Sequence, residues 1–219
     1  NWQAKFQLVD VINMMKPLTK KAASIFDPNT IPTVLRNAFK TAEAERPGAV
    51  HLELPEDVAE EEAGARVQKR GEVRRPGPDH RAIERAVELI EKAKNPLLLV
   101  SSGANRKRVS QYLLDFVNRT GLYVVHTQMG KGVVPDDCER SLFSTGIHKY
   151  DYVNCGIDKA DLIITVGYNI VEYPPFVWNR NLDKTILNID FVESEPDAYF
   201  NRSVEVIGDI SHSLRRIAE

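Results

Sequence analysis

Hydrophobic and polar positions follow a helical period in residues 30–45. Apolar residues recur there at the spacing of one helix face, namely at Ile31, Val34, Leu35, Ala38, Phe39 and Ala42. Asn29 or Thr30 suits the capping position, and Pro32 suits the first turn. The pattern predicts an amphipathic helix with one buried face.

The period changes to that of a strand after the turn at Pro47-Gly48. In AVHLELP, residues 49–55, the apolar residues Val50, Leu52 and Leu54 alternate with polar neighbours. A helix and a strand are too few elements to close a hydrophobic core. We therefore expect residues 1–57 to be the last part of an α/β domain whose beginning is absent.

A charged stretch that is poor in large apolar residues follows at 58–78, VAEEEAGARVQKRGEVRRPGP. Its glycines and prolines interrupt any regular period, which is typical of an extended linker. A domain boundary is expected there, with a second domain over residues 79–219.

Helical and strand periods alternate throughout residues 79–219. Amphipathic helices are predicted after Asp79 and Asp209 and between them, with apolar positions at Ile83, Val87, Ile90, Val109, Leu113, Phe116, Val117, Ile210, Leu214 and Ile217. The short β-branched runs are PLLLV, LYVVHT, LIITVG, TILNID and VEVIGD. These patterns predict a doubly wound, mainly parallel six-stranded sheet of the Rossmann-like α/β class.

Charge and cysteine content exclude several kinds of partner. With 29 basic and 31 acidic residues, the formal charge of −2 is too small to attract nucleic acid or an anionic membrane. The two cysteines form no CxxC pair, and no apolar run could span a bilayer. The first residues include neither a methionine nor an apolar signal core, so we expect a truncated or processed start and a cytoplasmic protein.

Four predicted strand ends are rich in glycine or acidic residues: SSGAN at 101–105, TQMGKG at 127–132, VGYN at 166–169 and IDFVESE at 189–195. Ligands of doubly wound sheets bind at such ends, where glycine allows close approach. A Walker A loop is excluded because Lys131 is followed by Gly132. Nucleotide binding and plain turn chemistry both explain the glycines, and Asp190 suits either a ribose contact or a helix cap.

Other candidate groups favour structural roles. One loop contains the carboxylates Asp190, Glu193, Glu195 and Asp197. Carboxylates so close in sequence indicate a solvated loop more than a cation site, and no metal site is predicted. His126, His148 and Cys155 have no partner at the spacing of a nucleophile dyad or a metal site. The aromatic segment 168–179, YNIVEYPPFVWN, suits a lid over the strand ends, an interface or a cover for the core.

Longer stretches occur in a fixed order along almost the whole chain: FQLVDVINMMKPLTK, IPTVLRNAFKTAEAERPGAVHLELPEDVA, NPLLLVSSGA, TQMGKGVVPDD, DKADLIITVGYN and TILNID. In this order they resemble the acetolactate synthase branch of the thiamine-diphosphate-dependent enzymes. Such enzymes contain a pyrimidine-binding, a central and a diphosphate-binding domain. The resemblance implies that residues 1–57 end the first and residues 79–219 form the second, while the third is missing.

The resemblance implies thiamine diphosphate and Mg²⁺ as cofactors, with the thiamine serving as electron sink. The family's activating glutamate and its Gly-Asp-Gly to Asn motif are not in this sequence, because the only Gly-Asp pair, Gly208-Asp209, continues into Ile210. The chain alone is therefore expected to be inactive. Phe6 and Gln7 match the Phe-Gln pair that lines the substrate side of the active site in this family, where Gln7 would orient a 2-oxo acid.

Several relatives bind FAD in a structural role on the central domain. The positions implied by the resemblance are Gly103, Thr127, Met129, Gly130, Gly167 and Asp190. Biosynthetic enzymes have Arg-Phe-Asp after the VG turn, whereas this chain has Tyr168-Asn169-Ile170, which is closer to the flavin-free catabolic enzymes. The resemblance leaves FAD binding open.

The parent protein is thus expected to be an acetolactate synthase that converts pyruvate to 2-acetolactate and CO₂. The alternatives are another thiamine-diphosphate-dependent 2-oxo-acid decarboxylase or carboligase, and a noncatalytic module that binds FAD or another nucleotide. The missing pyrimidine-binding and diphosphate-binding domains are the expected partners. Apolar surface along residues 6–15 and 30–45 is expected to favour a homo-oligomer.

Overall fold

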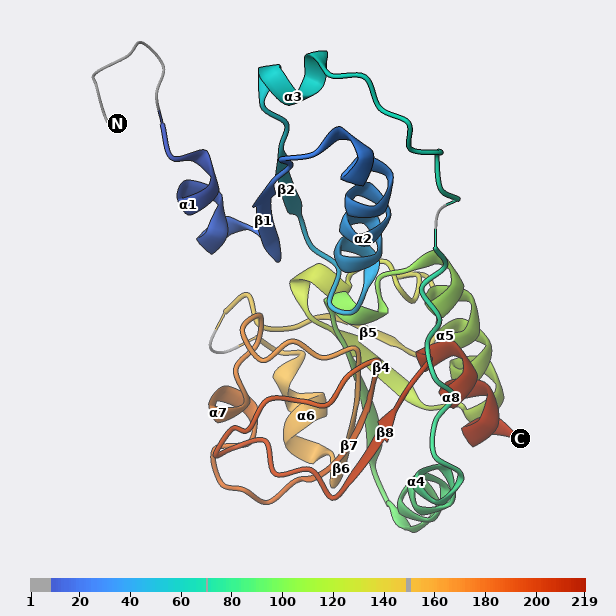
Figure 1. Ribbon diagram of the computed structural model, residues 1–219. Helices are drawn as coiled ribbons and strands as arrows, with labels where there is room; N and C mark the ends of the chain where they lie inside the picture. Colours follow the sequence, from blue (N-terminus) through green and yellow to red (C-terminus); the bar gives the residue numbers. More distant parts are fainter. Residues whose placement is uncertain (1–8, 70, 149–150) are drawn as a thin grey trace. The chain divides into compact units, whose positions relative to one another are not determined.

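The computed structural model describes residues 9–69, 71–148 and 151–219. The chain forms two compact units, Asn1–Arg74 (unit 1) and Arg75–Glu219 (unit 2) (Figure 1). Phe6 and Gln7 lie outside the described residues.

Unit 1 contains short helices around a two-stranded parallel sheet. Its elements are α1 (Val11–Met15), η1 (Lys16–Leu18), β1 (Lys21–Ser24), η2 (Pro28–Thr30), α2 (Ile31–Glu43), β2 (Val50–Glu53) and α3 (Glu56–Glu60). In the sheet, Lys21 of β1 lies opposite Val50 of β2. The helix and strand that the sequence predicts here are confirmed as α2 and β2.

The apolar side chains of unit 1 are incompletely covered. No residue of α2 is buried, and Phe39 on this helix is 56% exposed. An apolar groove of about 230 Å³ runs between α2 and β2 and is lined by Leu35, Ala38, Phe39, Ala42, Val50 and Leu52. The sequence predicts that one face of this helix is buried, but in this structure that face is uncovered.

The segment between α3 and the next helix is irregular. From Glu61 to Asp79 the described residues form neither helix nor strand. Helix α3 includes the first residues of the expected linker, because it continues to Glu60. This segment ends at Asp79, whose carboxylate accepts hydrogen bonds from the backbone N–H groups of Arg81 and Ala82 and caps the next helix.

Unit 2 contains a six-stranded sheet with the order β5-β4-β3-β6-β7-β8. The strands are β3 (Pro96–Val100), β4 (Tyr123–His126), β5 (Ser141–Ser144), β6 (Leu162–Val166), β7 (Thr185–Asp190) and β8 (Val204–Ile207). All neighbouring strands pair in parallel. The predicted doubly wound parallel sheet is confirmed, and its order is that of the Rossmann fold.

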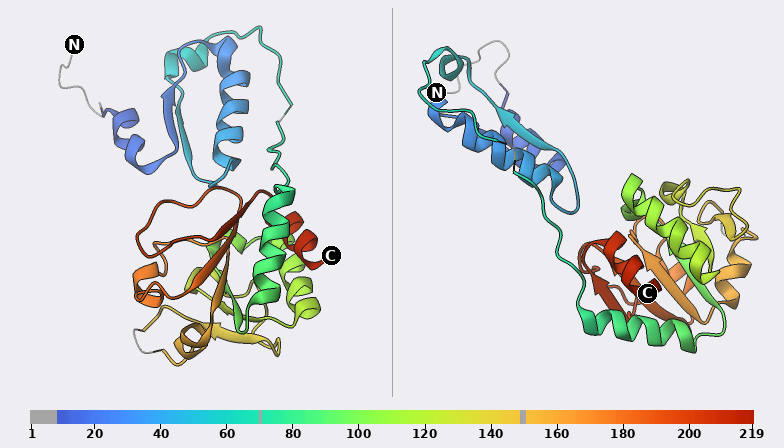
Figure 2. Two further views of the ribbon diagram at one scale, coloured as in Figure 1. Left: turned by 90° about the horizontal axis from the view of Figure 1, so that it is seen from below. Right: turned by 90° about the vertical axis from the view of Figure 1, so that its right-hand side faces the viewer.

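Helices cover both faces of this sheet (Figures 1 and 2). One face packs against α4 (His80–Lys92), α5 (Lys107–Thr120) and α8 (Ile210–Ala218), and the other packs against α6 (Asn154–Lys159) and α7 (Pro175–Trp178). Along β3, Leu98 and Val100 join the first core, whereas Leu97 and Leu99 join the second. A strand that alternates its apolar side chains between two cores reads as a continuous hydrophobic run, as the sequence shows.

The ends of the long helices have the residues that their geometry requires. Asp209 caps α8, because its carboxylate accepts the backbone N–H of His212 at 2.9 Å. Helix α5 ends at Thr120 and is capped by Gly121, which has a positive φ of 69°. The helices predicted after Asp79 and Asp209 are confirmed, and both aspartates cap them. No described helix is long and apolar enough to cross a membrane.

Candidate functional site

The strand order of unit 2 reverses between β3 and β6. In open parallel sheets, ligands bind outside the carboxyl ends of the strands at this switch point. The single-turn helices η3 (Ser102–Ala104) and η4 (Gln128–Gly130) follow β3 and β4 there. Five of the six positions implied for FAD lie on the segments that follow β3, β4 and β6, and Asp190 ends β7.

Contacts between these loops account for the glycines. The N–H of Gly103 donates to the carbonyl oxygen of Gly167 at 2.9 Å, and a Cβ on Gly103 would lie 2.8 Å from the Cα of Gly167. Gly167 has a φ of +57°, and its Cβ would lie 2.3 Å from the backbone nitrogen of Ala104. A Cβ on Gly130 would lie 2.5 Å from the carbonyl oxygen of Val100. Glycine is required here by the chain's own packing.

The remaining predicted positions have separate surroundings. Met129 is 59% exposed, and its carbonyl oxygen accepts a hydrogen bond from the Asn105 side chain at 3.1 Å. Asp190 is buried, and its carboxylate accepts the N–H of Phe191 at 2.6 Å. Phe191 lies under two cations, with the Arg106 guanidinium 4.1 Å and the Arg75 guanidinium 5.0 Å from its ring centroid. Asp190 thus lies beside Phe191 and the two arginines, apart from the glycine contacts of the other loops.

Three side chains that the sequence analysis did not associate meet at the switch point: Ser101, Thr127 and Glu172. We call them the switch-point cluster. The Glu172 Oε2 atom lies 2.6 Å from Thr127 Oγ1 and 2.9 Å from Ser101 Oγ. Ser101 and Thr127 are 0% and 1% exposed. A carboxylate is therefore held by two buried hydroxyl groups beyond the ends of β3 and β4.

Buried aromatic residues fix the segment that carries Glu172. The Tyr168 hydroxyl donates to the carbonyl oxygen of Tyr173 and accepts from Trp178 Nε1, the latter at 2.9 Å. The Tyr168 ring packs against the Phe200 ring, with 5.1 Å between the ring centroids. Burial raises the pKa of both Tyr168 and Tyr173. Among the interpretations of segment 168–179, the structure supports a cover for the core, because Tyr168, Tyr173 and Trp178 belong to the second core, whereas Phe176 is 55% exposed.

The loop 128–137, QMGKGVVPDD, is anchored in the core of unit 2. Val133 and Val134 are each 1% exposed, and the Ser110 hydroxyl donates to the carbonyl oxygen of Val133. The N–H of Gly130 is bonded to the Thr127 carbonyl at 3.0 Å. These contacts give the loop a structural role.

His126 has partners that its sequence position did not reveal. Its Nε2 lies 3.3 Å from Asp136 Oδ1, and its Nδ1 lies 3.1 Å from Ser144 Oγ. The imidazole is 1% exposed and joins the 128–137 loop to β5. His148 and Cys155 are exposed. Among the described side chains, no group of three or more His, Cys, Asp or Glu could hold a metal ion.

A partly buried polar network crosses β6, β7 and β8. Thr165 donates to Asn188 at 2.8 Å, Asn188 donates to Glu205 at 3.0 Å, and Ser194 donates to the same carboxylate at 2.6 Å. Burial raises the pKa of Glu205, but the hydrogen bonds from Ser194 and Asn188 and the charge of Arg202 outweigh it, so this pKa lies below its ordinary value. The network fixes the segment that joins β7 to β8.

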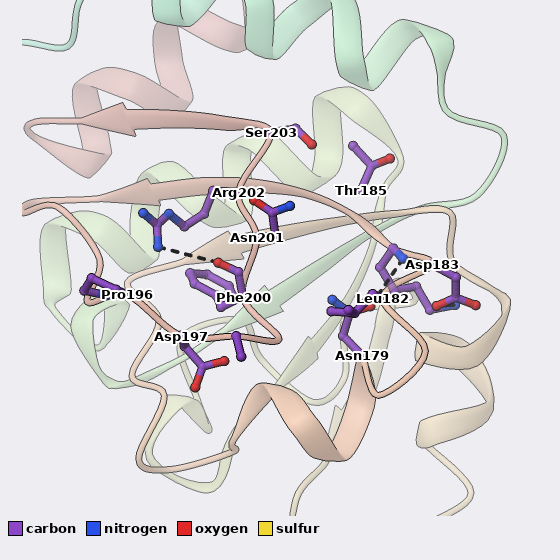
Figure 3. A pocket seen from close by; sticks show the side chains of 12 residues that line it. Asn179, Leu182, Asp183, Thr185, Pro196, Asp197, Phe200, Asn201, Arg202 and Ser203 are labelled. Carbon is purple, nitrogen blue, oxygen red and sulfur yellow. Dashed lines mark hydrogen bonds and ion pairs between the residues drawn. The ribbon is translucent and has the colours of Figure 1, made fainter.

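A cavity of about 520 Å³ opens at the amino ends of β7 and β8, at the edge opposite the switch point. Its walls come from residues 179–185 and 196–203, which face each other in Figure 3. Polar groups in these walls are engaged within the chain: Asn179 Nδ2 donates to the Tyr199 carbonyl at 2.7 Å, and Lys184 Nζ donates to Asp158 and Ala160 carbonyls at 2.7 and 2.9 Å. The switch point is the better candidate site, since doubly wound sheets bind ligands there.

Two kinds of cofactor can be compared with these residues. A nucleotide phosphate at the switch point does not fit the structure, because the Glu172 carboxylate already takes the hydroxyl groups of Ser101 and Thr127. Asp209, in the only Gly-Asp pair, caps α8 and lies 3.8 Å from the Arg108 guanidinium. It does not fit a magnesium ligand.

Comparisons with known proteins cover nearly the whole chain. Residues 83–217 match the family model described as thiamine pyrophosphate enzyme, central domain. An acetolactate synthase of Bacillus subtilis is 29% identical over 213 residues, which are 96% of this chain and 37% of that protein. A catabolic acetolactate synthase of Raoultella terrigena is 29% identical over 217 residues, 97% of this chain and 38% of that protein. The chain therefore spans little more than a third of these relatives.

Solved structures share the fold. A Mycobacterium smegmatis protein described as a thiamin diphosphate-dependent enzyme superposes with a TM-score of 0.80 at 20% identity, over 95% of this chain and 40% of its own. The benzoylformate decarboxylase of Polynucleobacter necessarius gives a TM-score of 0.75 at 24% identity, over 96% and 40%. At these identities the likeness shows the fold alone.

Proposed function

The chain belongs to the thiamine pyrophosphate enzyme family, whose central domain its residues 83–217 form, and from this membership we propose that it is part of an acetolactate synthase. The substrate is pyruvate, a 2-oxo acid. Two molecules of pyruvate give one 2-acetolactate and one CO₂, so a carbon–carbon bond forms between substrates as a carboxylate is lost.

The observation that carries this proposal is similarity along the whole chain, in both units. The acetolactate synthases of Bacillus subtilis and Raoultella terrigena align with 96% and 97% of these residues, so the likeness includes unit 1 as well as the central domain. We infer that unit 1 up to residue 57 is the end of a pyrimidine-binding domain, that residues 58–78 are a linker and that residues 79–219 are the central domain.

Thiamine diphosphate and Mg²⁺ are the cofactors we propose for the whole protein. The family implies them, and the described residues of this chain provide no arrangement for the metal. The residues that hold both are therefore proposed to lie in segments outside this chain, and the chain alone is proposed to be inactive. Phe6 and Gln7 remain our candidates for lining the substrate side of that site.

The stoichiometry of pyruvate conversion tests this function. The whole protein, supplied with thiamine diphosphate, Mg²⁺ and ¹³C-labelled pyruvate, is expected to consume two pyruvates for each CO₂ and to give a labelled five-carbon product in nuclear magnetic resonance spectra. The 219-residue chain serves as the control and is expected to leave pyruvate unchanged. One CO₂ per pyruvate with a two-carbon product would identify a simple decarboxylase instead, and no consumption of pyruvate would contradict both.

The second candidate is another thiamine-diphosphate-dependent 2-oxo-acid decarboxylase or carboligase. It is kept because a benzoylformate decarboxylase has the same fold, with a TM-score of 0.75, so the fold does not select the 2-oxo acid. Parallel assays with pyruvate and with an aromatic 2-oxo acid distinguish the two. Preference for the aromatic acid would favour the second candidate.

We propose that the missing domains and a second copy of the protein are the partners of the uncovered α2 face. The supporting observations are the apolar groove beside Phe39 and the exposure of this side chain. Light scattering of the chain is expected to show concentration-dependent association that Phe39→Glu reduces. A monomer at every concentration would contradict it.

Both cysteines are free thiols, which supports a reducing compartment, and we propose the cytoplasm.

A further inference from the structure

The switch point of unit 2 carries the hydrogen-bond donors that a phosphate group would use. Ser101 follows the last residue of β3, and Thr127 follows the last residue of β4. Both side chains are buried and end in hydroxyl groups that can donate. In Rossmann-type sheets the nucleotide pyrophosphate lies at the turn after the first strand, against the start of the next helix.

An anion of the chain itself already occupies these donors. Glu172 Oε2 lies within hydrogen-bond distance of both hydroxyl groups, at 2.9 Å from Ser101 Oγ and 2.6 Å from Thr127 Oγ1. The backbone N–H of Asn169 also donates to Ser101 Oγ, at 3.3 Å. A phosphate placed here would lose the hydroxyl donors and meet the carboxylate charge at close range.

Among the described residues near these strand ends, no buried side-chain donor lacks a hydrogen-bond partner. Within the part of the chain that the structure describes, one buried side-chain nitrogen or oxygen has no hydrogen-bond partner, and this is Nε2 of His51 on β2 in unit 1. A site built for an absent anion would be expected to leave buried donors without partners. The described residues of the switch point leave no buried side-chain donor of this kind.

The position of Glu172 is fixed on both sides. Tyr168 and Tyr173 are 5% and 3% exposed, and the hydroxyl of the first donates to the carbonyl of the second. Behind them, Gly103 and Gly167 close the loops upon each other through the 2.9 Å hydrogen bond between their backbones. The carboxylate is therefore presented to Ser101 and Thr127 by a segment anchored in the core.

We propose that Glu172 is a built-in anion that takes the place of a nucleotide phosphate and excludes nucleoside diphosphates, and FAD with its ADP moiety, from the switch point. The chemical class that is refused is the phosphorylated nucleotide. The proposal stands apart from the proposed function, because nucleotide binding and pyruvate conversion are measured separately.

Calorimetric titration of the full chain with ADP and with FAD tests the proposal. The wild-type chain is expected to show no saturable binding up to about 1 mM ligand, and Glu172→Ala is expected to bind both ligands at least about tenfold more tightly. Glu91→Ala removes the same charge from an exposed position on α4 and is expected to behave as the wild type. Adenosine, which has no phosphate, is expected to gain nothing from Glu172→Ala.

Three results would overturn the proposal. They are tight FAD or ADP binding by the wild type, equal affinities of the wild type and Glu172→Ala (including no binding by either), and an equal gain for adenosine. If circular dichroism shows that Glu172→Ala is unfolded, Glu172→Gln replaces it, because glutamine keeps the size and loses the charge. A smaller gain in the same direction would then support the proposal, and no gain would contradict it.

Discussion

Helices α2 and α4 have the same length of 13 residues, yet the two units use them differently. Helix α4 buries Ile83 and Ala86 against the sheet of unit 2, whereas α2 buries no residue in unit 1. Both helices have an apolar stripe at helical spacing. The spacing of apolar residues therefore shows which face of a helix has to be covered. Whether that face is covered within its own unit depends on the size of the sheet against which the helix packs.

The sheets explain this difference. Unit 2 has six strands with helices on both faces, so the central strands of its sheet are covered on both sides. Unit 1 has two strands, and two strands are rarely stable without further packing. These differences support our proposal that unit 2 is a complete domain and that unit 1 is part of one.

Removal of one aromatic ring from each unit should give the largest contrast. Phe116 on α5 is 1% exposed, and Phe39 on α2 is 56% exposed. Phe116→Ala is expected to lower the free energy of unfolding of unit 2 by about 3–5 kcal/mol, because it leaves a cavity in a packed core. Phe39→Ala should change unfolding by less than about 0.5 kcal/mol. Urea denaturation followed by circular dichroism measures both, and similar losses would break the comparison.

Glycine replacements should give the next largest effect. Gly167→Ala adds a Cβ 2.3 Å from a backbone nitrogen at a positive φ, so a loss of at least about 1–3 kcal/mol is expected from backbone strain, with more from the clash. In unit 1, a Cβ on Gly64 would meet Asn29 Oδ1 at an ordinary 3.8 Å, and Gly64→Ala should be tolerated. Gly132 has a φ of +83° and nothing within 4 Å, so Gly132→Ala isolates the strain. If Gly167→Ala and Gly132→Ala lowered the free energy of unfolding equally, the contact between the loops at Gly103 and Gly167 would contribute nothing to the effect.

Loss of a helix cap should have a smaller effect that again depends on the unit. Asp209→Ala is expected to cost about 1 kcal/mol, because α8 is buried along much of its length and Asp209 caps the N–H of His212. Asp10 caps α1 through Asn13 in the same way, but no residue of α1 is buried. Asp10→Ala should leave the thermal midpoint of unit 2 unchanged. A drop in that midpoint would mean that the units are coupled in stability.

The smallest expected effect depends on pH. Because the pKa of Glu205 is lowered in the folded state, its ionised form stabilises unit 2 above the ordinary pKa of about 4.5, and this stabilisation is lost as pH falls through the folded pKa. Glu205→Gln is therefore expected to lower the thermal midpoint at pH 7 and to reduce its decline in acid. Midpoints measured from neutral to acid pH test this, and parallel curves for both proteins would contradict it.

The sequence predicted well those elements whose buried residues follow a regular helical or strand pattern. Residues 96–100 and 162–166 became β3 and β6, because strands covered on both faces require continuous apolar runs. The strand β5, SLFS, was missed, since it lies at an edge of the sheet and needs few apolar residues. The same holds for β1, KAAS, which is short and rich in small side chains.

The candidate site was less predictable, because its contacts join distant parts of the chain. Glycine at 103, 130 and 167 was correctly placed at strand ends, but the sequence could not show that Gly103 and Gly167 pack on each other. Glu172 reaches Ser101 across 71 positions and Thr127 across 45 positions, and no local pattern marks such a pair. Only the strand order brings these residues together.

Native-state hydrogen exchange on the full chain tests the central claim most directly, namely that unit 2 is a complete central domain and unit 1 is part of a larger one. Backbone amides in β3, β6 and β7 are expected to exchange slowly, by global unfolding of unit 2, while amides in α2 and β2 exchange much faster through local opening. Equal protection of α2 and β6 in dilute solution would contradict the account, because it would show that unit 1 closes a core of its own.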